Sequence, residues 1–411
     1  MKTQLILFYI YLATNALLYS CNIKNNNTSN NNEDSLNKIC IEEKIIQKPI
    51  IIGAEDTASY FKLLKNKKVG LTANATSVSF SIHTLDLMLN NGINVTKIYS
   101  PEHGFRGDAE PGVRVNNDID SKTGVPIVSL FGKNLKPKPE QLKGIDIMVY
   151  DMQDVGCRFF TYISTLHNIM EACGECGIPV MVLDRPNPNI DYVAGPIRDN
   201  SAISFVSLDP IPIVYGMTVG ELANMINFEG WLKNSVKCDL TIIPVKNYYR
   251  NSKYCPPVKP SPNLPNYLAI RLYPSLCLFE ATSISVGRGT MEPFTKIGYP
   301  DINFGEYVFT PQDIKGMQTN PLHKDKKCYG VDFSNANPDT IKFSLQYFIN
   351  MYHKFPQHNM INRKEWLKLL YGNNSLEKMI SEGKSEKEII ESWQPQLNDF
   401  KKVRAKYLIY Q

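Results

Sequence analysis

The sequence lacks any concentration of charge of one sign. Its 411 residues carry 45 Lys and Arg against 40 Asp and Glu, so the formal net charge is only +5 and is spread along the chain. It has no dense basic run interleaved with aromatic residues, the pattern that nucleic-acid-binding proteins usually show. We therefore do not expect nucleic acid as a partner, whereas 43% hydrophobic residues are enough to bury a large core.

Motifs for several common chemistries are also missing. The first predicted strand continues into "VGLTANATSVS" without a GxGxxG turn or a GxxxxGK[ST] loop to hold phosphates. The six histidines show no HExxH or other paired spacing for a metal ion, and no GxSxG elbow is present for a serine nucleophile. We expect a site without metal or cofactor, and a nucleotide-dependent oxidoreductase ranks far behind the other readings.

Only the N-terminus contains a long apolar run. The stretch Leu5–Leu18 follows a single lysine and ends in "LLYSC", which is typical of an export signal and resembles a bacterial lipobox. We expect residues 1–20 to be a signal peptide and Cys21 to be lipidated; an ordinary signal peptide or a signal anchor is the alternative. Residues 21–44, dominated by asparagine, are predicted to be a flexible tether. The chain is therefore expected in the cell envelope, as a membrane-anchored lipoprotein facing the periplasm or the exterior.

Export would place the other eight cysteines in a compartment that permits disulfides. Their pairing cannot be deduced from the sequence. The "CGEC" motif, Cys173 to Cys176, comes at the end of a helical pattern, whereas redox CxxC pairs usually open a helix. We interpret these two cysteines as free thiols or a local disulfide.

Short apolar runs alternate with helical patterns from Lys68 to Asp184. The helical patterns close on glycines suited to a helix C-cap. Continuously apolar strands separated by helices indicate a parallel sheet covered on both faces, so we predict an α/β, doubly wound fold. The predicted strands are 68–73, 93–100, 125–131, 145–151 and 178–184.

The same alternation continues past residue 200 and then changes. Thr218 and Glu221 have capping-box spacing at the start of a predicted helix, and "CDLTIIPV" is a further strand. The five prolines of "YYRNSKYCPPVKPSPNLPNY" predict a long loop, and such loops are usually functional. Beyond "SVGRGTMEPFTKIG" helical patterns dominate, near 338–352 and 385–405. We therefore divide the mature chain into a larger domain at 45–285 and a smaller, largely helical auxiliary domain at 286–411.

Charged and polar residues gather at the carboxyl ends of the predicted strands, where open parallel sheets bind ligands. Glu102 follows the second predicted strand within "SPEHGFRGDAEPG". The residues after the fourth and fifth strands are Asp151, Gln153, Asp154 and Arg158, and Asp184, Arg185 and Asn187. Repetition at one topological position predicts a shared site, although any one group could instead brace its loop through ion pairs and caps.

The chemistry that remains is carboxylate chemistry with arginine support. Glycoside cleavage needs an acid to protonate the leaving oxygen and groups that hydrogen-bond sugar hydroxyls. Suitable carboxylates are Glu102, Asp151, Asp154 and Asp184. Arginines that could bind an anionic substituent are Arg106, Arg158, Arg185 and Arg288.

Six blocks of sequence together resemble a known enzyme family. They are "SPEHGFRGDAEPG", "YDMQDVGCRFFTYISTLHNIMEA", "VLDRPNPN", "YGMTVGELA", "SPNLPN" and "SVGRGTMEPF", and they run in order from about residue 50 towards the C-terminal "VRAKYLIY". On these blocks the chain is similar to the exo-β-N-acetylmuramidase family called NamZ, formerly the DUF1343 group. The resemblance implies a Rossmann-like domain, a C-terminal auxiliary domain and an active cleft between them.

The resemblance also implies an activity, the release of terminal N-acetylmuramic acid from the non-reducing end of peptidoglycan fragments such as MurNAc-GlcNAc. The family's proposed catalytic glutamate corresponds to Glu102, which we expect to act as general acid. Retention or inversion at the anomeric carbon stays open. The alternative is a non-catalytic envelope protein that binds muropeptides through the same strand ends.

The expected partners are peptidoglycan-derived sugars and the membrane, the latter through a lipid at Cys21; a homodimer is also left open. The lactyl carboxylate of N-acetylmuramic acid suits a site rich in arginine. The predicted substrate-binding residues are His103, Arg106, Asp151, Gln153, Asp154, Arg158, Tyr162, Asp184, Arg185, Asn187 and Arg288.

Overall fold

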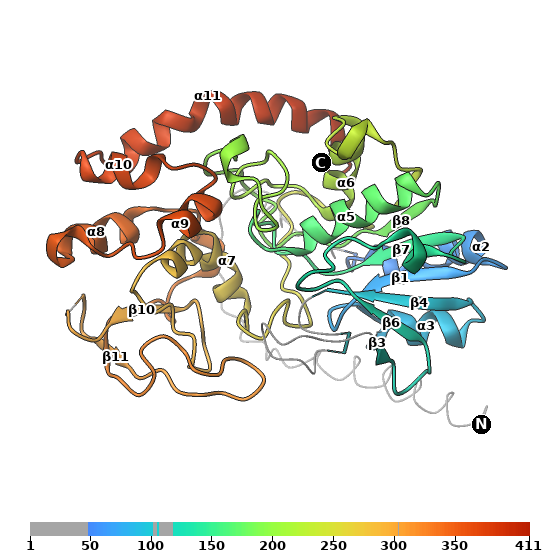
Figure 1. The fold of residues 1–411 in the computed structure, drawn as a ribbon, viewed down its shortest axis with the longest axis horizontal. Helices are drawn as coiled ribbons and strands as arrows, with labels where there is room; N and C mark the ends of the chain where they lie inside the picture. Colours follow the sequence, from blue (N-terminus) through green and yellow to red (C-terminus); the bar gives the residue numbers. More distant parts are fainter. Residues whose placement is uncertain (1–47, 102–104, 107–117, 303) are drawn as a thin grey trace, which may run out of the picture. The chain divides into compact units, whose positions relative to one another are not determined.

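Seven strands form the central sheet, in the order β5-β6-β4-β1-β7-β8-β9 (Figure 1). Six of them run parallel, and the short edge strand β5 pairs antiparallel with β6. All six strands that the sequence predicts are present, which confirms the α/β doubly wound fold. The strands are β1 (Val69–Ala73), β4 (Val95–Ser100), β5 (Asp118–Ile119), β6 (Pro126–Ser129), β7 (Ile147–Asp151), β8 (Val180–Leu183) and β9 (Leu240–Ile243).

The structure is a computed structural model that describes residues 48–101, 105–106, 118–302 and 304–411. The predicted signal peptide, the lipidation site Cys21 and most of the tether therefore lie outside the described residues. Residues 48–411 belong to one compact unit, and the domain boundary that we placed at residue 285 stays a prediction. No helix in the described part of the chain is both long and apolar enough to cross a membrane.

Helices cover both faces of the sheet (Figure 1). One face packs against α2 (Thr57–Leu64) and α3 (Thr84–Asn90) in a cluster that contains the strand residues Leu71, Ile98 and Val149. The opposite strand side chains, such as Tyr99 and Met148, pack against α5 (Tyr162–Glu175) and α6 (Val219–Phe228). Alternate side chains of one strand point to opposite faces, so a sheet buried on both faces requires the continuously apolar strands seen in the sequence.

Helix α6 begins at the predicted capping box. The Thr218 hydroxyl accepts a hydrogen bond from the Glu221 backbone N–H at 3.3 Å, and the Glu221 carboxylate accepts one from the Thr218 N–H at 3.0 Å. The two groups satisfy each other's otherwise unpaired backbone donors, as the capping box does in general. Helix α5 ends at Glu175, and both Cys173 and Cys176 are free thiols, as are all seven described cysteines.

The C-terminal region is mainly helical but also contains a sheet that the sequence analysis did not predict. Strands β10 (Lys296–Tyr299), β12 (Cys328–Asp332) and β11 (Tyr307–Phe309) form it, in that antiparallel order. The helices are α7 (Tyr267–Leu276), α8 (Gln346–Lys354), α9 (Lys364–Tyr371), α10 (Ser375–Ser381) and α11 (Glu386–Arg404). Their buried side chains continue the cluster on the α5 side of the sheet, so this region and the sheet share one core.

The two helices expected in this region have different outcomes. Helix α11 confirms the prediction at 385–405 and opens with a capping box at Ser385. The helix expected near 338–352 begins later, at Gln346, so its predicted start was wrong. The physical reason is that the Arg271 guanidinium donates hydrogen bonds to the carbonyls of Pro338 and Ile341, at 3.2 and 2.8 Å, and holds this segment against α7.

The last residues of the chain return to the carboxyl end of the sheet. The Tyr410 hydroxyl donates to Asp184 at 2.6 Å and accepts from the Val245 N–H at 2.9 Å. The Glu221 carboxylate accepts from the backbone N–H groups of Ile409 and Tyr410. The C-terminal segment is therefore anchored to β8, β9 and α6.

Candidate active site

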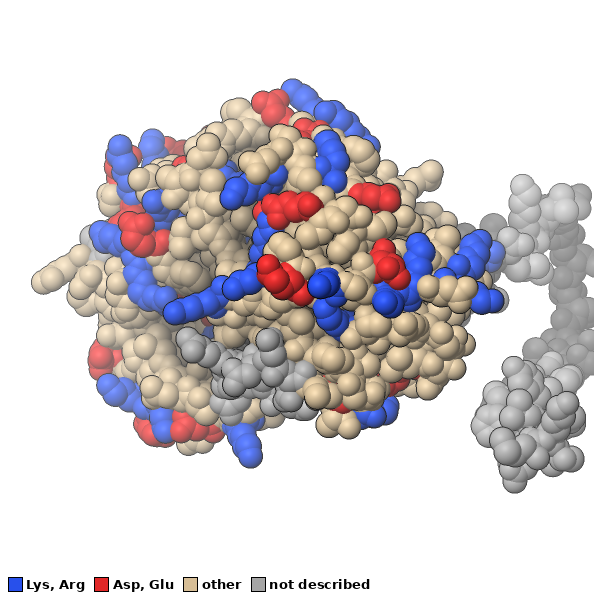
Figure 2. Space-filling view, turned by 45° about the vertical axis from the view of Figure 1, so that its right-hand side comes forward, with Lys and Arg blue, Asp and Glu red and all other residues tan. Residues whose placement is uncertain are grey.

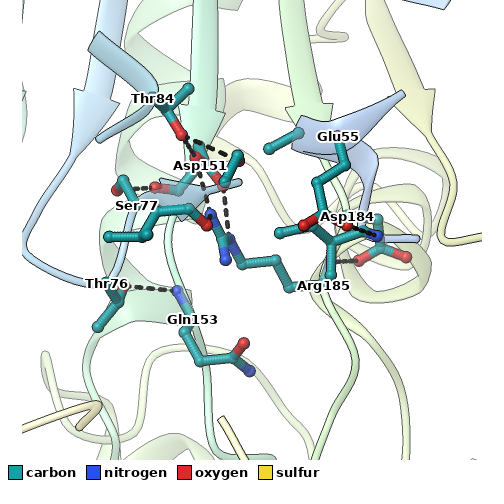
Figure 3. A network of polar contacts seen from close by, with 12 residues as sticks. Glu55, Thr76, Ser77, Thr84, Asp151, Gln153, Asp184 and Arg185 are labelled. Carbon is teal, nitrogen blue, oxygen red and sulfur yellow. Dashed lines mark hydrogen bonds and ion pairs between the residues drawn. The ribbon is translucent and has the colours of Figure 1, made fainter. Parts of the chain in front are cut away.

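A buried ion pair joins two of the strand ends that the sequence analysis singled out. Figure 3 shows the Arg185 side chain reaching from the end of β8 to Asp151 at the end of β7. The Arg185 Nε and Nη2 donate to the two carboxylate oxygens of Asp151 at 2.6 and 3.0 Å, and the Thr84 hydroxyl donates to Asp151 at 2.6 Å. Asp151 is 0% exposed and Arg185 2%. Asp151 and Arg185, which the sequence analysis assigned to one site, therefore do contact each other, but the contact is buried inside the protein.

Asp184 is engaged in the same way. Its oxygens accept hydrogen bonds from the backbone N–H groups of Arg185 and Gly220 and from the hydroxyls of Thr218 and Tyr410. Gly220 is required there, because a Cβ would lie 2.7 Å from the Asp184 carboxyl carbon. With four donors around a fully buried carboxylate, Asp184 acts as a junction between β8, the start of α6 and the C-terminus.

Gln153 and Asp154 follow β7, and each has one buried side-chain oxygen, Gln153 Oε1 and Asp154 Oδ1, without a partner among the described residues. The Gln153 side chain extends away from the Asp151–Arg185 pair in Figure 3 and donates to the carbonyls of Asp154 and Pro186, both at 2.8 Å. One Asp154 oxygen, Oδ2, accepts from the Tyr215 hydroxyl and the Gly156 N–H. The other, Oδ1, is buried and has no partner among the described residues. Burial raises the pKa of Asp154 to about 6, against the opposing effect of those hydrogen bonds.

Arg158 and Asn187 have structural contacts only. Arg158 is 0% exposed, and its guanidinium donates to the carbonyls of Pro196, Ile211 and Leu370. The Asn187 amide donates to the Met217 carbonyl at 2.8 Å, while its oxygen accepts from the Asn189 N–H at 2.7 Å. Both residues hold loops together, and their positions offer little to a ligand.

Arg106 lies between two carboxylates. Its Nε and Nη2 donate to Asp120 at 2.6 and 2.8 Å, and its Nη1 and Nη2 donate to Asp86 at 3.4 and 3.2 Å. The hydrogen bonds from Arg106 lower the pKa of Asp120 to about 2. The guanidinium therefore keeps its charge but shares all of its donor nitrogens with the protein.

A cavity of about 500 Å³ opens at the carboxyl end of the sheet. Its walls are the loop after β1, Arg106, the first residue of α5, Tyr162, and the proline-rich loop at 257–262, closed by Gly316 and Met317. The loop whose prolines predicted an irregular segment thus lines a cavity at the place where parallel sheets bind ligands. Its size lies within the range of roughly 300 to 1,000 Å³ that ligand pockets span.

A second cavity of about 300 Å³ shares Tyr162 and Ser261 with the first. Its walls come from the segment before α5, from Asn263 and from the C-terminal region, including Arg288 and Glu280. The Tyr162 hydroxyl donates to the Pro260 carbonyl at 3.0 Å and so fixes the border between the two cavities. The two cavities lie side by side and connect the sheet with the C-terminal region.

Glu280 is the residue of this second cavity that the sequence analysis missed. It lies in the 3-10 turn η4 (Cys277–Ala281), and its carboxylate forms an ion pair with Arg288. In sequence it stands in the apolar run "SLCLFEATSIS", where one acidic residue eight positions before an arginine gives no motif. Its spacing of eight positions from Arg288 is the only signal that the sequence offers for this pair, and it is a weak one.

Glu102 and His103 lie outside the described residues, so their predicted roles stay predictions. The residues on either side are described: Ser100 ends β4, and Phe105 is buried against the His83 ring, 4.5 Å between ring centroids. In the described part of the chain no group of three or more His, Cys, Asp or Glu residues is arranged to hold a metal ion. Figure 2 shows basic and acidic side chains interspersed over one face of the molecule.

Comparison with known proteins places almost all of the described chain in one family. Residues 69–268 match the family model "Exo-beta-N-acetylmuramidase NamZ, N-terminal", and residues 271–410 match the corresponding C-terminal model. The chain is 39% identical over 386 residues to "Peptidoglycan beta-N-acetylmuramidase NamZ" of Bacillus subtilis strain 168, which covers 89% of this chain and 92% of the relative.

Two crystal structures of DUF1343 family proteins from Bacteroides fragilis NCTC 9343 share the fold. One is 46% identical with a TM-score of 0.82, covering 89% of this chain and 99% of that one. The other is 29% identical with a TM-score of 0.78, covering 88% and 99%. With matches to both domain models along almost all of the described chain, this protein belongs to the NamZ family of exo-β-N-acetylmuramidases.

Proposed function

We propose that the chain is an exo-acting glycoside hydrolase that releases terminal N-acetylmuramic acid from the non-reducing end of peptidoglycan fragments such as MurNAc-GlcNAc. The observation that carries this function is the 39% identity to the Bacillus subtilis peptidoglycan β-N-acetylmuramidase over 92% of that relative's length. The two adjoining cavities at the carboxyl end of the sheet support it, because they offer room for more than one sugar ring. The primary test is incubation with MurNAc-GlcNAc and detection of free MurNAc.

In this proposal Glu102 is the general acid that protonates the leaving oxygen. Its place in the sequence supports the role: it comes two residues after Ser100, the last residue of β4, and four residues before Arg106, which lines the larger cavity. Strand β4 pairs with β1, and the loop after β1 forms another wall of that cavity. The described residues on either side of Glu102 therefore connect β4 with a wall of that cavity.

Glu102→Gln tests the assignment with two leaving groups. General acid catalysis contributes about 100- to 10,000-fold, and it matters most when the leaving group is a poor one. We expect release of MurNAc from MurNAc-GlcNAc to fall by at least about 100-fold, and release from 4-nitrophenyl β-muramide to fall by less, because nitrophenolate leaves without protonation. The matched control is Glu140→Gln, an exposed carboxylate on α4 (Pro139–Leu142). Full activity of Glu102→Gln on both substrates would refute the role.

A non-catalytic muropeptide-binding protein is the alternative reading. It predicts saturable binding of MurNAc-GlcNAc without any free MurNAc. Isothermal titration together with chromatography of the same mixture separates the two readings.

We further propose that the enzyme is exported and held at the membrane by a lipid on Cys21. The apolar run Leu5–Leu18 and the ending "LLYSC" support this location, which would also bring the enzyme to its substrate. The wild-type protein should partition into the detergent phase of a Triton X-114 extract. Cys21→Ser should stay in the aqueous phase or remain unprocessed, and detergent partition of that variant after signal cleavage would argue against the lipid.

A further inference from the structure

Of the four arginines expected to meet an anionic group, two line neither of the two cavities and a third donates from all of its guanidinium nitrogens to protein carboxylates. Arg158 donates to three backbone carbonyls, and Arg185 to Asp151. Arg106 shares its donor nitrogens between Asp86 and Asp120. Arg158 is 0% exposed and Arg185 2%, so neither presents its guanidinium to a cavity, and a ligand carboxylate at Arg106 would have to displace Asp86 or Asp120, which are themselves buried.

Arg288 is different because it lines a cavity and also has one guanidinium nitrogen without a protein partner in the described part of the chain. Its Nε and Nη2 both contact a single oxygen of Glu280, at 2.8 and 2.6 Å. Its Nη1 has no hydrogen-bond partner among the residues that the structure describes. The carbon atom at the centre of the guanidinium lies 5.2 Å from the centre of the Phe294 ring, which fixes the plane of the group. The Arg288 side chain is 30% exposed and that of Glu280 21%.

Both residues of this pair line the 300 Å³ cavity. Aromatic side chains form much of the remaining wall, among them Phe160, Tyr273 and Trp366, and apolar ring faces suit the C–H faces of a sugar. Asn263 also lines the cavity and is 2% exposed, and its Oδ1 has no partner among the described residues. Buried polar atoms are usually satisfied, so this cavity has unused polar capacity.

The volume of the cavity limits the number of sugar residues that it can hold. About 300 Å³ is at the lower end of the range for ligand pockets, which fits one substituted monosaccharide rather than a chain. An enzyme that removes one terminal residue needs such a pocket beside a larger space for the rest of the substrate. The 500 Å³ cavity across Tyr162 provides that space.

We propose that the 300 Å³ cavity receives the terminal sugar and that Arg288 is the specificity-determining residue that binds the carboxylate of its lactyl group. Glu280 holds the guanidinium in place and competes with the ligand for its charge. This assignment rests on the proposed muramidase function. It goes beyond the expectation that some arginine binds the lactyl carboxylate, because it names one of the four arginines. It also predicts that substitution of the partner, Glu280, changes KM for the acid in the opposite direction.

The test compares a MurNAc glycoside that has a free lactyl carboxylate with its methyl ester. Wild-type enzyme should prefer the acid by about 10- to 100-fold in kcat/KM, the value of one charge-assisted contact. In Arg288→Gln we expect kcat/KM for the acid to fall to the level of the ester, through a higher KM at nearly unchanged kcat. Activity of this variant on the ester should stay within about 3-fold of wild type.

Glu280→Gln provides a readout of opposite sign. Removing the competing carboxylate should lower KM for the acid by about 2- to 10-fold and leave the ester unaffected. Lys259→Gln is the matched comparison, since Lys259 is an exposed cation that lines the neighbouring 500 Å³ cavity. It should keep the wild-type preference for the acid.

The outcomes separate the inference from the function. If wild type releases no MurNAc from either substrate, the proposed function fails. If wild type is active but Arg288→Gln keeps the preference for the acid, or loses activity equally on both substrates, this assignment is overturned while the function stands. If only Lys259→Gln loses the preference for the acid, the lactyl carboxylate binds in the larger cavity and the assignment to Arg288 is wrong. If Glu280→Gln lowers kcat/KM for the acid as much as Arg288→Gln does, the pair has a structural role and the assignment is also wrong.

Discussion

Two arginine–carboxylate pairs in this molecule have the same shortest N–O distance and different surroundings. Asp151–Arg185, at the carboxyl end of the central sheet, and Glu280–Arg288, in the C-terminal region, each have a contact of 2.6 Å. The side chains of the first pair are 0% and 2% exposed, and those of the second 21% and 30%. The distance between the charges therefore says nothing about the role of either pair, whereas their exposure does.

The difference lies in what remains for a ligand. At the sheet, Thr84 also donates to Asp151, Arg185 also donates to a backbone carbonyl, and the pair lines neither of the two cavities. Glu280 and Arg288 both line the 300 Å³ cavity, and Arg288 Nη1 has no hydrogen-bond partner among the described residues. The first pair thus positions the strand ends, and in our proposal the second offers the remaining guanidinium nitrogen of Arg288 to a ligand carboxylate.

The largest expected effect is on the stability of the sheet. Asp151→Asn keeps the shape of the side chain but leaves Arg185 charged and buried without a counter-ion. Loss of one partner from a buried pair costs about 3 to 5 kcal/mol, so the free energy of unfolding should fall by that amount. Urea unfolding followed by tryptophan fluorescence measures it.

Glu280→Gln is the matched change at the other pair and should cost less than about 1 kcal/mol, because a partly exposed ion pair is screened by water. Equal losses in the two variants would contradict the comparison. They would mean that exposure does not separate a bracing pair from a ligand-binding one.

A second, smaller effect concerns Asp154, which has one unsatisfied oxygen within the sheet-end network. Burial raises its pKa to about 6, above the value of about 3.9 in the unfolded chain. The folded state therefore binds the extra proton, and this stabilisation is present below about pH 4 and is lost as the pH rises through 6. The difference corresponds to about 2 to 3 kcal/mol.

Asp154→Asn should remove this pH dependence. The amide nitrogen can take the place of Oδ1, which faces no donor, while the amide oxygen keeps the hydrogen bonds from Tyr215 and Gly156. The variant should gain stability relative to wild type at pH 8 and much less at pH 4.5. Measuring the difference between the two proteins at both pH values cancels the other titrating groups, and a difference that does not change with pH would exclude a raised pKa at Asp154.

The sequence predicted the sheet well because its signals are local. Apolar runs of strand length and the Thr218–Glu221 capping box depend on neighbouring residues, and both appear as expected. The antiparallel sheet β10-β12-β11 depends instead on pairing across about 30 residues, for example Ile297 with Val331, and no local pattern announced it. Long-range pairing is the part of the fold that a single sequence shows least.

The candidate site was predictable only in part for a related reason. The rule that ligands bind at the carboxyl ends of parallel strands led to the correct end of the sheet, where a cavity lies. It could not separate Arg158, with no exposed surface, from Arg288, which lines a cavity, because the side-chain environment depends on loops distant in sequence. Glu280 was missed since its partner and its cavity exist only in the folded chain.

The smallest effect concerns the C-terminal anchor, where Tyr410 is buried and Tyr407 is only partly buried. The Tyr410 hydroxyl bridges Asp184 and the Val245 N–H inside the protein, and that of Tyr407 binds Glu229 near the surface at 2.6 Å. Tyr410→Phe leaves a buried backbone N–H without a partner and should cost about 1 to 2 kcal/mol.

Tyr407→Phe, the same change three residues earlier, should cost less than about 0.5 kcal/mol, since water can replace the lost contact at Glu229. Urea unfolding gives both values, and hydrogen exchange at Val245 should speed up in Tyr410→Phe alone. If the two variants lose equal stability, the C-terminal segment is held by its backbone contacts to Glu221, and the buried hydroxyl adds nothing to the sheet-end network.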